Sequence, residues 1–223
     1  MKKSYVCLLF LILIMACNPA STSQENTAVG KWWTEKDRSF IISELNRTTE
    51  ALKAEVENTT DEQWHFHERP SRWSIAEIVE HLEMQNQLHY REISVVSNAP
   101  QYLEFRLITA GNDQYFSNYS IDNTRSQARW FLEPLDRFAS KQDGVAAFYR
   151  ARGKLIEFVE ETEIDLRKQF TFRTPVEGKE VSELKIGQVR DLHQLLLTGI
   201  AHTDRHLGQI RNIKLHEDYP KSY

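Results

Sequence analysis

Cysteine is scarce in this sequence of 223 residues. Its two cysteines, Cys7 and Cys17, lie close to the N-terminus, and none follows them. A domain built from the rest of the chain has no thiol, which excludes stabilising disulfides, cysteine nucleophiles and thiolate metal ligands. Any metal site in that domain must therefore use nitrogen or oxygen ligands.

An excess of basic residues is also absent. The 28 Lys and Arg residues face 32 Asp and Glu residues, so the net charge is −4, and removing the two positive charges of Lys2 and Lys3 makes it −6. A basic patch with interleaved aromatic residues, which is the electrostatic signature of nucleic-acid binding, is not found. The sequence therefore predicts no nucleic-acid partner.

The one marked apolar run lies near the N-terminus. Residues 5–15 follow Lys2 and Lys3, and the run is shorter than the ~20 residues that a membrane-spanning helix needs. Such a run is typical of a secretory signal peptide. It ends in Ala16-Cys17, a small residue followed by cysteine, which resembles the lipobox of bacterial lipoproteins. The alternative is an ordinary signal peptide with an incidental cysteine.

These features predict an exported protein held by lipid at a bacterial membrane, on its periplasmic or cell-surface side. Residues 1–16 would form the lipoprotein signal peptide, and Cys17 would carry the lipid. A flexible tether would cover residues 17–35, a helical domain residues 36–216, and a C-terminal tail residues 217–223.

The helical domain has the apolar periodicity of amphipathic helices, and no segment alternates convincingly with a strand period. In the first segment, for example, Ile41, Leu45 and Leu52 lie along one face. The fold class predicted is all-α. The four expected helices cover about residues 37–56, 74–96, 144–161 and 191–215.

The second helix has unusually complete start signals. Ser74 and Glu77 have the spacing of a capping box, in which each side chain bonds the backbone amide of the other residue. Trp73 and Ile78 occupy the positions of a hydrophobic staple. We therefore expect the helix to begin directly after Ser74.

The connection between the second and third helices is long for a compact domain. It covers about residues 97–143, and such a length indicates a functional loop or local structure of its own. Residues 130–138 could form a short helix broken by Pro134. Residues 170–187 form a second irregular stretch, with Pro175 and two glycines.

His202 and His206 are the most informative pair of residues. Their separation of four places both imidazoles on one face of a helix, one turn apart, where both can bind a single ion. Apolar residues flank them, and burying two uncompensated imidazoles is costly. A metal ion would remove that cost, although such a pair alone is also compatible with ordinary hydrogen bonding.

A third histidine, His81, lies on the inward stripe of the second helix. A single core histidine usually donates a hydrogen bond to a carbonyl group, but three inward histidines on facing helices indicate a metal site. His193 lies more than two turns before His202, and we expect it to be exposed.

Two sequence blocks resemble the DinB superfamily. Residues 72–82 read RWSIAEIVEHL, and residues 202–210 read HTDRHLGQI. They match the family pattern of a Trp-Ser start, a Glu-His-Leu turn and a final His-x-x-Arg-His-x-x-Gln-Ile. The resemblance covers about residues 37–215.

The resemblance implies a four-helix bundle with a long crossover connection between helices two and three. It also implies that His81, His202 and His206 bind one divalent ion, with zinc or nickel preferred. Some relatives are low-molecular-weight thiol transferases or isomerases, others are described as metal-dependent hydrolases, and many have no known activity. This chain differs from the usual member of the family in its predicted export and in the long connection between its second and third helices.

Two acidic residues near His81 are candidates for a general base that acts with metal-bound water. They are Glu80 and Glu77, although the capping box already accounts for Glu77 and Glu80 could be a solvated helix residue. Arg205 and Gln209 are expected to orient the ligands or the last helix.

The function predicted is that of a metal-dependent enzyme, a hydrolase or thiol transferase, acting on a small molecule. Export favours hydrolysis, because thiol cofactors of that kind are chiefly cytoplasmic. The alternatives are a non-catalytic, metal-stabilised binding module and a bundle whose histidines bind no metal. A homodimer is a further expectation.

Overall fold

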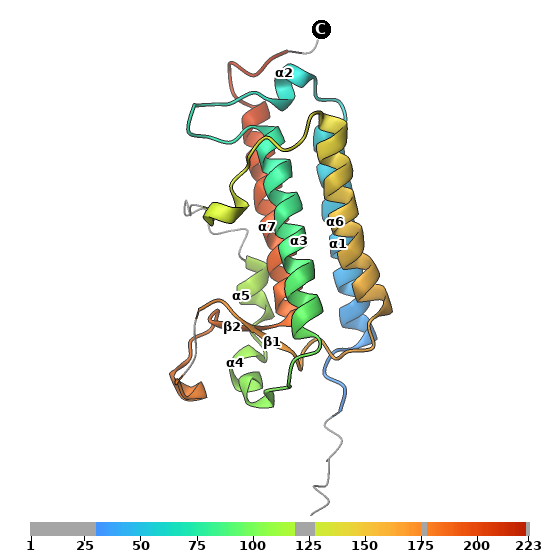
Figure 1. Cartoon of the computed structure of the whole chain (residues 1–223), viewed down its shortest axis with the longest axis vertical. Helices are drawn as coiled ribbons and strands as arrows, with labels where there is room; N and C mark the ends of the chain where they lie inside the picture. Colours follow the sequence, from blue (N-terminus) through green and yellow to red (C-terminus); the bar gives the residue numbers. More distant parts are fainter. Residues whose placement is uncertain (1–29, 119–127, 175–177, 222–223) are drawn as a thin grey trace, which may run out of the picture. The chain divides into compact units, whose positions relative to one another are not determined.

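Four long helices form a bundle in the computed structural model, which describes residues 30–118, 128–174 and 178–221. Around the bundle, α1 packs on α6 and α7, and α3 packs on the same two helices (Figure 1). The predicted all-α fold is confirmed. The long helices are α1 (Glu35–Val56), α3 (Ile75–Val96), α6 (Lys141–Glu161) and α7 (Leu192–Lys214).

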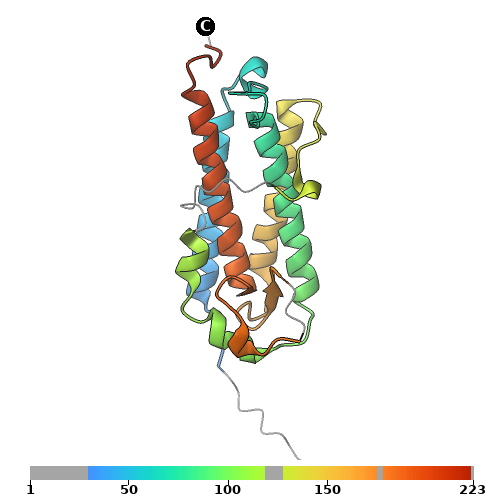
Figure 2. The ribbon, with the colours of Figure 1, turned by 90° about the vertical axis from the view of Figure 1, so that its left-hand side faces the viewer.

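The direction of the helices explains the long connection. α1 and α7 run one way along the bundle, and α3 and α6 run the other way (Figures 1 and 2). Because neighbouring α3 and α6 are parallel, the chain must return along the length of the bundle between them. The elements described in this crossover are η1 (Leu103–Phe105), α4 (Arg106–Thr109), α5 (Asp113–Ser117) and η3 (Trp130–Leu132).

Capping boxes fix the starts of the two helices that carry the histidines. Ser74 and Glu77 form the predicted box at the start of α3. Asp191 and Gln194 form another at the start of α7. Each box satisfies orphan backbone amides on both sides of the helix start, so these helices begin at defined residues.

Several short elements were not predicted from periodicity. β1 (Phe170–Phe172) and β2 (Val189–Asp191) pair in antiparallel register, with Phe170 opposite Asp191. The expectation that residues 170–187 are wholly irregular is therefore wrong at their start. Asp191 ends β2 and also caps α7, so the small sheet positions the helix that carries two of the histidines. The remaining elements are α2 (Asp61–Trp64) and η4 (Val181–Glu183).

The core extends beyond the expected bounds of the domain. Trp33 is fully buried, and the Trp32 and Trp33 amides donate to the Asp165 carboxylate at 2.6 and 3.0 Å. At the other end, Tyr219 packs against the apolar cluster of the bundle. The compact unit accordingly covers Lys31–Tyr223. Among the described residues, no helix combines the length and apolarity needed to cross a membrane.

Candidate metal centre

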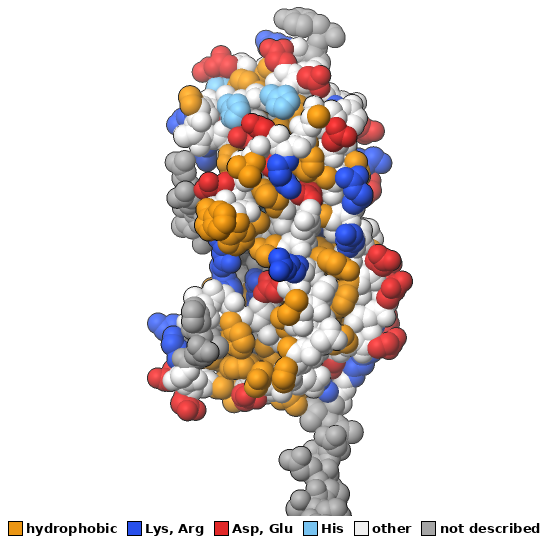
Figure 3. All heavy atoms as spheres, in the orientation of Figure 1, with side chains coloured by type: hydrophobic (Ala, Val, Ile, Leu, Met, Phe, Trp, Pro, Cys, Tyr) orange, Lys and Arg blue, Asp and Glu red, His pale blue; other side chains and the backbone are white. Residues whose placement is uncertain are grey.

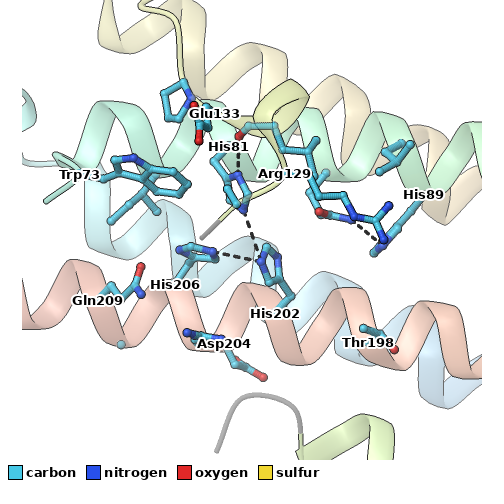
Figure 4. Close-up of a pocket in the computed structure, with 18 of the residues that line it drawn as sticks. Trp73, His81, His89, Arg129, Glu133, Thr198, His202, Asp204, His206 and Gln209 are labelled. Atoms are coloured by element: carbon cyan, nitrogen blue, oxygen red, sulfur yellow. Dashed lines mark hydrogen bonds between the residues drawn. The ribbon is translucent and has the colours of Figure 1, made fainter. Parts of the chain in front are cut away.

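Three histidine side chains converge between α3 and α7. His81 comes from α3, and His202 and His206 lie one turn apart on α7. Figure 4 shows the three rings pointing toward one another, and one ring nitrogen from each lies within 4.8 Å of the other two. The prediction that these residues meet at one point is confirmed.

The distances between the ring nitrogens match the geometry of a metal site. The Nε2 atom of His202 lies 3.4 Å from Nε2 of His81 and 3.1 Å from Nε2 of His206. Nitrogen ligands ~2.0–2.1 Å from a tetrahedral zinc ion are ~3.3 Å from one another. The cluster could therefore hold a divalent ion with little rearrangement.

A backbone carbonyl group sets the orientation of the first ligand. The Nδ1–H group of His81 donates to the carbonyl oxygen of Leu132, in η3, at 2.8 Å. This tautomer leaves the lone pair of Nε2 directed at the other two histidines. Hydrogen bonds of this kind behind a ligand fix its ring and raise its basicity.

Burial keeps the three imidazoles neutral. It lowers the pKa of His81, whose bond to Leu132 acts in the opposite direction. The pKa of His202 lies well below its ordinary value because of burial and the neighbouring charges, first that of His81. Burial, followed by the charges of His202 and His81, does the same to His206. Neutral imidazole is the form that binds a metal.

Trp73 has a larger part in the site than the sequence indicated. Its ring stacks against His206, with centroids 6.2 Å apart and planes inclined by 16°, and its centroid lies 4.8 Å from that of His81. It also packs in the same apolar cluster as Ile78, as the staple predicts. One indole thus shields one side of the histidine cluster and anchors the start of α3.

Arg205 and Gln209, which were predicted to lie around the histidines, line the cavity beside them. Gln209 lies next to His206 in Figure 4, and it acts to raise the pKa of that histidine. Arg205 is half-buried on α7, and its charge helps to lower the pKa values of both α7 ligands. Glu77 serves in the capping box, where it accepts the Ser74 amide at 2.7 Å.

Glu80 is buried on a different side of α3 from the cluster. Its carboxylate accepts the Leu135 amide at 2.9 Å, the Arg137 amide at 3.3 Å and the Arg137 Nε–H at 2.8 Å. It therefore holds the segment that supplies the carbonyl group of Leu132. A solvated Glu80 is excluded by its 3% exposure, and its role as a base stays a prediction.

Two other histidines are buried outside the cluster. His193 is only 3% exposed, and its Nδ1 accepts the indole N–H of Trp33 at 3.3 Å, so the expectation that it is exposed is wrong. Trp33 and Asp113, far away in the chain, cover the first turn of α7. His89 on α3 is bonded to Gln85 at 2.7 Å, and burial lowers its pKa to about 3.

The histidine cluster lies in the wall of a large cavity. The cavity has a volume of about 1790 Å³ and follows α3 and α7 from Trp73 to Arg190 in β2. Figure 3 shows the surface of this side, hollowed between the region of η3 and the lobe that contains the strands. An ion bound by the three histidines would therefore be reachable by a small molecule.

One of the comparisons with known proteins found a match, which is to a protein family. The sequence profile of the DinB superfamily matches residues 44–210, a range that contains all three histidines of the cluster. Comparison with curated proteins and with solved structures found no match. Cys17, the predicted lipidation site, lies outside the described residues. The profile match spans most of the chain, which therefore belongs to the DinB superfamily.

Proposed function

We propose that the chain is a metal-dependent hydrolase that acts on a small molecule at the centre formed by His81, His202 and His206. A divalent ion bound there supplies Lewis acidity and lowers the pKa of a bound water to ~7. The convergence of three neutral nitrogen donors in the wall of a large cavity is the observation that supports this function most directly. Imidazole ligands suit zinc and nickel, which we propose as the resident ions.

Other residues of the chain orient the histidines and exclude water from one side of the cluster. Leu132 and the Glu80 carboxylate that holds its segment keep His81 in the ligating tautomer. Trp73 keeps one side of the cluster dry. His81, His202 and His206 would hold the ion, which would supply Lewis acidity toward water or substrate as in catalytic zinc sites with three protein ligands.

A carboxylate other than Glu80 is better placed as the base. Glu133 and Asp204 both line the cavity near the cluster (Figure 4). The Asp204 side chain points away from the three histidine rings in Figure 4. Glu133 follows Leu132 and lies beside His81, so we propose Glu133 as the group that accepts a proton from the attacking water.

Metal content tests the centre itself. Protein purified without added metal should contain one zinc or nickel ion per chain by elemental analysis, and His202→Ala should lose it. The variant should also unfold at lower temperature, because metal bound to the native state stabilises it by ~3–4 kcal/mol at 100 to 1,000 times the dissociation constant. His65→Ala, in an exposed loop, is the matched control. Stoichiometric metal in His202→Ala would rule out the ligand assignment.

Activity separates the enzyme from the binding module. We expect the metal-loaded chain to hydrolyse small 4-nitrophenyl esters or phosphate esters, and a chelator or Glu133→Gln to reduce the rate at least about tenfold. Turnover only with an added thiol would favour the transferase. Full metal loading without any turnover would favour the non-catalytic binding module.

We also propose that the chain is exported and anchored by lipid at Cys17. The apolar run before Cys17 and the small residue next to it support this location. An exported location also supports hydrolysis over thiol transfer, because thiol cofactors of the kind used by such transferases are chiefly cytoplasmic.

A further inference from the structure

A second group of functional side chains lines the cavity at the end opposite Trp73. Three arginines contribute there: Arg129 from the segment before η3, Arg173 just after β1, and Arg190 in β2. Arg190 is buried, whereas Arg129 and Arg173 are exposed. The arrangement is thus one guanidinium in the floor of the cavity and two nearer to solvent. Figure 3 shows basic side chains on the wall of the hollow beside the η3 region.

Among the residues that the structure describes, Arg190 forms one loose ion pair. Glu92 on α3 is its ion-pair partner, and both carboxylate oxygens lie at the long distance of 3.4 Å from Nη2. Glu92 also accepts the hydroxyl group of Thr171. Burial lowers the pKa of Arg190, and the charges of Arg173 and Arg129 act in the same direction, so both of these cations are near enough to repel Arg190.

Arg190 also retains unused hydrogen-bonding capacity. Its Nε–H group is buried and has no hydrogen-bond partner among the residues that the structure describes. A buried donor without a partner costs free energy, and most such donors in native proteins are satisfied. A ligand oxygen would satisfy it.

The whole cavity has the opposite charge bias from the chain. Among the described residues, its lining contains seven arginines and four acidic residues, although the chain carries a net charge of −4. Such a local reversal of sign attracts anions into a cleft. One of the four acids, Asp204, is already bound by Arg47.

We propose that Arg129, Arg173 and Arg190 form a subsite for the carboxylate or phosphate group of a small organic anion whose reacting end lies at the histidine cluster. Guanidinium groups bind both oxyanions through paired, charge-assisted hydrogen bonds, which explains why arginine and not lysine lines this cavity. The inference rests on the proposed function for the identity of the reacting end, but not for anion binding. It defines the substrate class as anionic.

Calorimetric titration of the full chain tests the subsite. The probes are benzoate and phenyl phosphate, which distinguish a carboxylate from a phosphate site, and benzamide, the neutral counterpart of benzoate. We expect one of the anions to bind and benzamide not to bind. Arg190→Met should weaken binding about tenfold or more, the size of effect expected when a charged hydrogen-bonding partner is lost.

Four further variants show whether any change in affinity is specific to the proposed subsite. Arg91→Met removes an exposed arginine of the same cavity that lies outside the group of three, and it should change the affinity less than about twofold. Glu92→Gln removes the competing carboxylate and should tighten binding. Arg129→Met and Arg173→Met alter exposed side chains, so they should weaken binding even if Arg190→Met fails to fold.

His202→Ala distinguishes this inference from the proposed function. Anion binding should persist in that variant, because the arginines do not need the metal. If His202→Ala abolishes binding while Arg190→Met leaves it intact, the anion binds the metal and the subsite is wrong. A chain that loads metal but binds neither anion overturns the inference alone. A chain that binds an anion but never contains metal overturns the proposed function alone.

Discussion

At the scale of single residues, Glu80 and His81 show how neighbours in a helix take different tasks. Successive helical residues point ~100° apart, so His81 faces α7 while Glu80 faces the segment after η3. The two are nevertheless connected. Glu80 holds the backbone at Leu135 and Arg137, and the same segment supplies the Leu132 carbonyl group that orients His81.

Replacing Glu80 with glutamine separates a positioning role from a catalytic one. Glu80→Gln removes the charged acceptor, so we expect metal affinity to fall about tenfold, as is typical of groups that support ligands from behind. Competition with a chromophoric chelator measures this affinity. Glu83→Gln is the control, because Glu83 also binds the Arg137 guanidinium, whereas the Leu135 and Arg137 amides donate to Glu80. Unchanged metal affinity with lost turnover would instead identify Glu80 as the base.

Sequence spacing was sufficient to predict that the histidines cluster but not which groups surround them. A separation of four places His202 and His206 on one face whatever the rest of the fold does. The role of the Leu132 carbonyl group could not be predicted from the sequence, because every residue has a backbone carbonyl group. The burial of His193 depends on Trp33, 160 positions away, and helical periodicity cannot reveal such a contact.

At the scale of elements, the length of a segment decided what could be predicted. The long helices span many turns, so apolar periodicity located them closely, and the capping box at Ser74 also located the start of α3. The strands β1 and β2 have three residues each and α2 has four, which is too short to establish any period. The parallel arrangement of α3 and α6 explains why the crossover is long.

The spacing of α3 and α7 depends on one glycine. A Cβ atom on Gly199 would lie 2.7 Å from Nδ1 of His89, a ring that is buried and bonded to Gln85. Gly199→Ala should therefore force the helices apart one turn before His202. We expect a loss of ~1–3 kcal/mol in unfolding free energy, measured in denaturant, together with weaker metal binding.

Gly208→Ala on the same helix is the control for this substitution. A Cβ atom at Gly208 meets no atom within 4 Å, so the higher helix propensity of alanine should stabilise the protein by up to ~1 kcal/mol. If the two variants have the same stability and metal affinity, then Gly199 does not set the helix spacing at the metal centre.

At the scale of the whole molecule, the net charge of the chain is negative, whereas the described lining of its cavity has an excess of positive charge. The net charge of −4 is unfavourable for binding to nucleic acid, whereas the arginines of the cavity favour a small anion. The proposed location also limits where the protein acts, because a lipid at Cys17 would keep the chain at a membrane surface.

The anchor can be tested with the two cysteines of the chain. Cys17→Ser should abolish acylation and release the protein to the soluble fraction, because the thiol is the only group in that position able to carry the lipid. Cys7→Ser is the matched control, since Cys7 lies inside the apolar run and would be removed with the signal peptide. Fractionation and metabolic labelling with a fatty acid measure both variants. If Cys17→Ser remains in the membrane fraction, another feature anchors the chain. Equal metal content in the two proteins would show that the metal centre forms independently of the lipid, as expected for ligands that all come from α3 and α7.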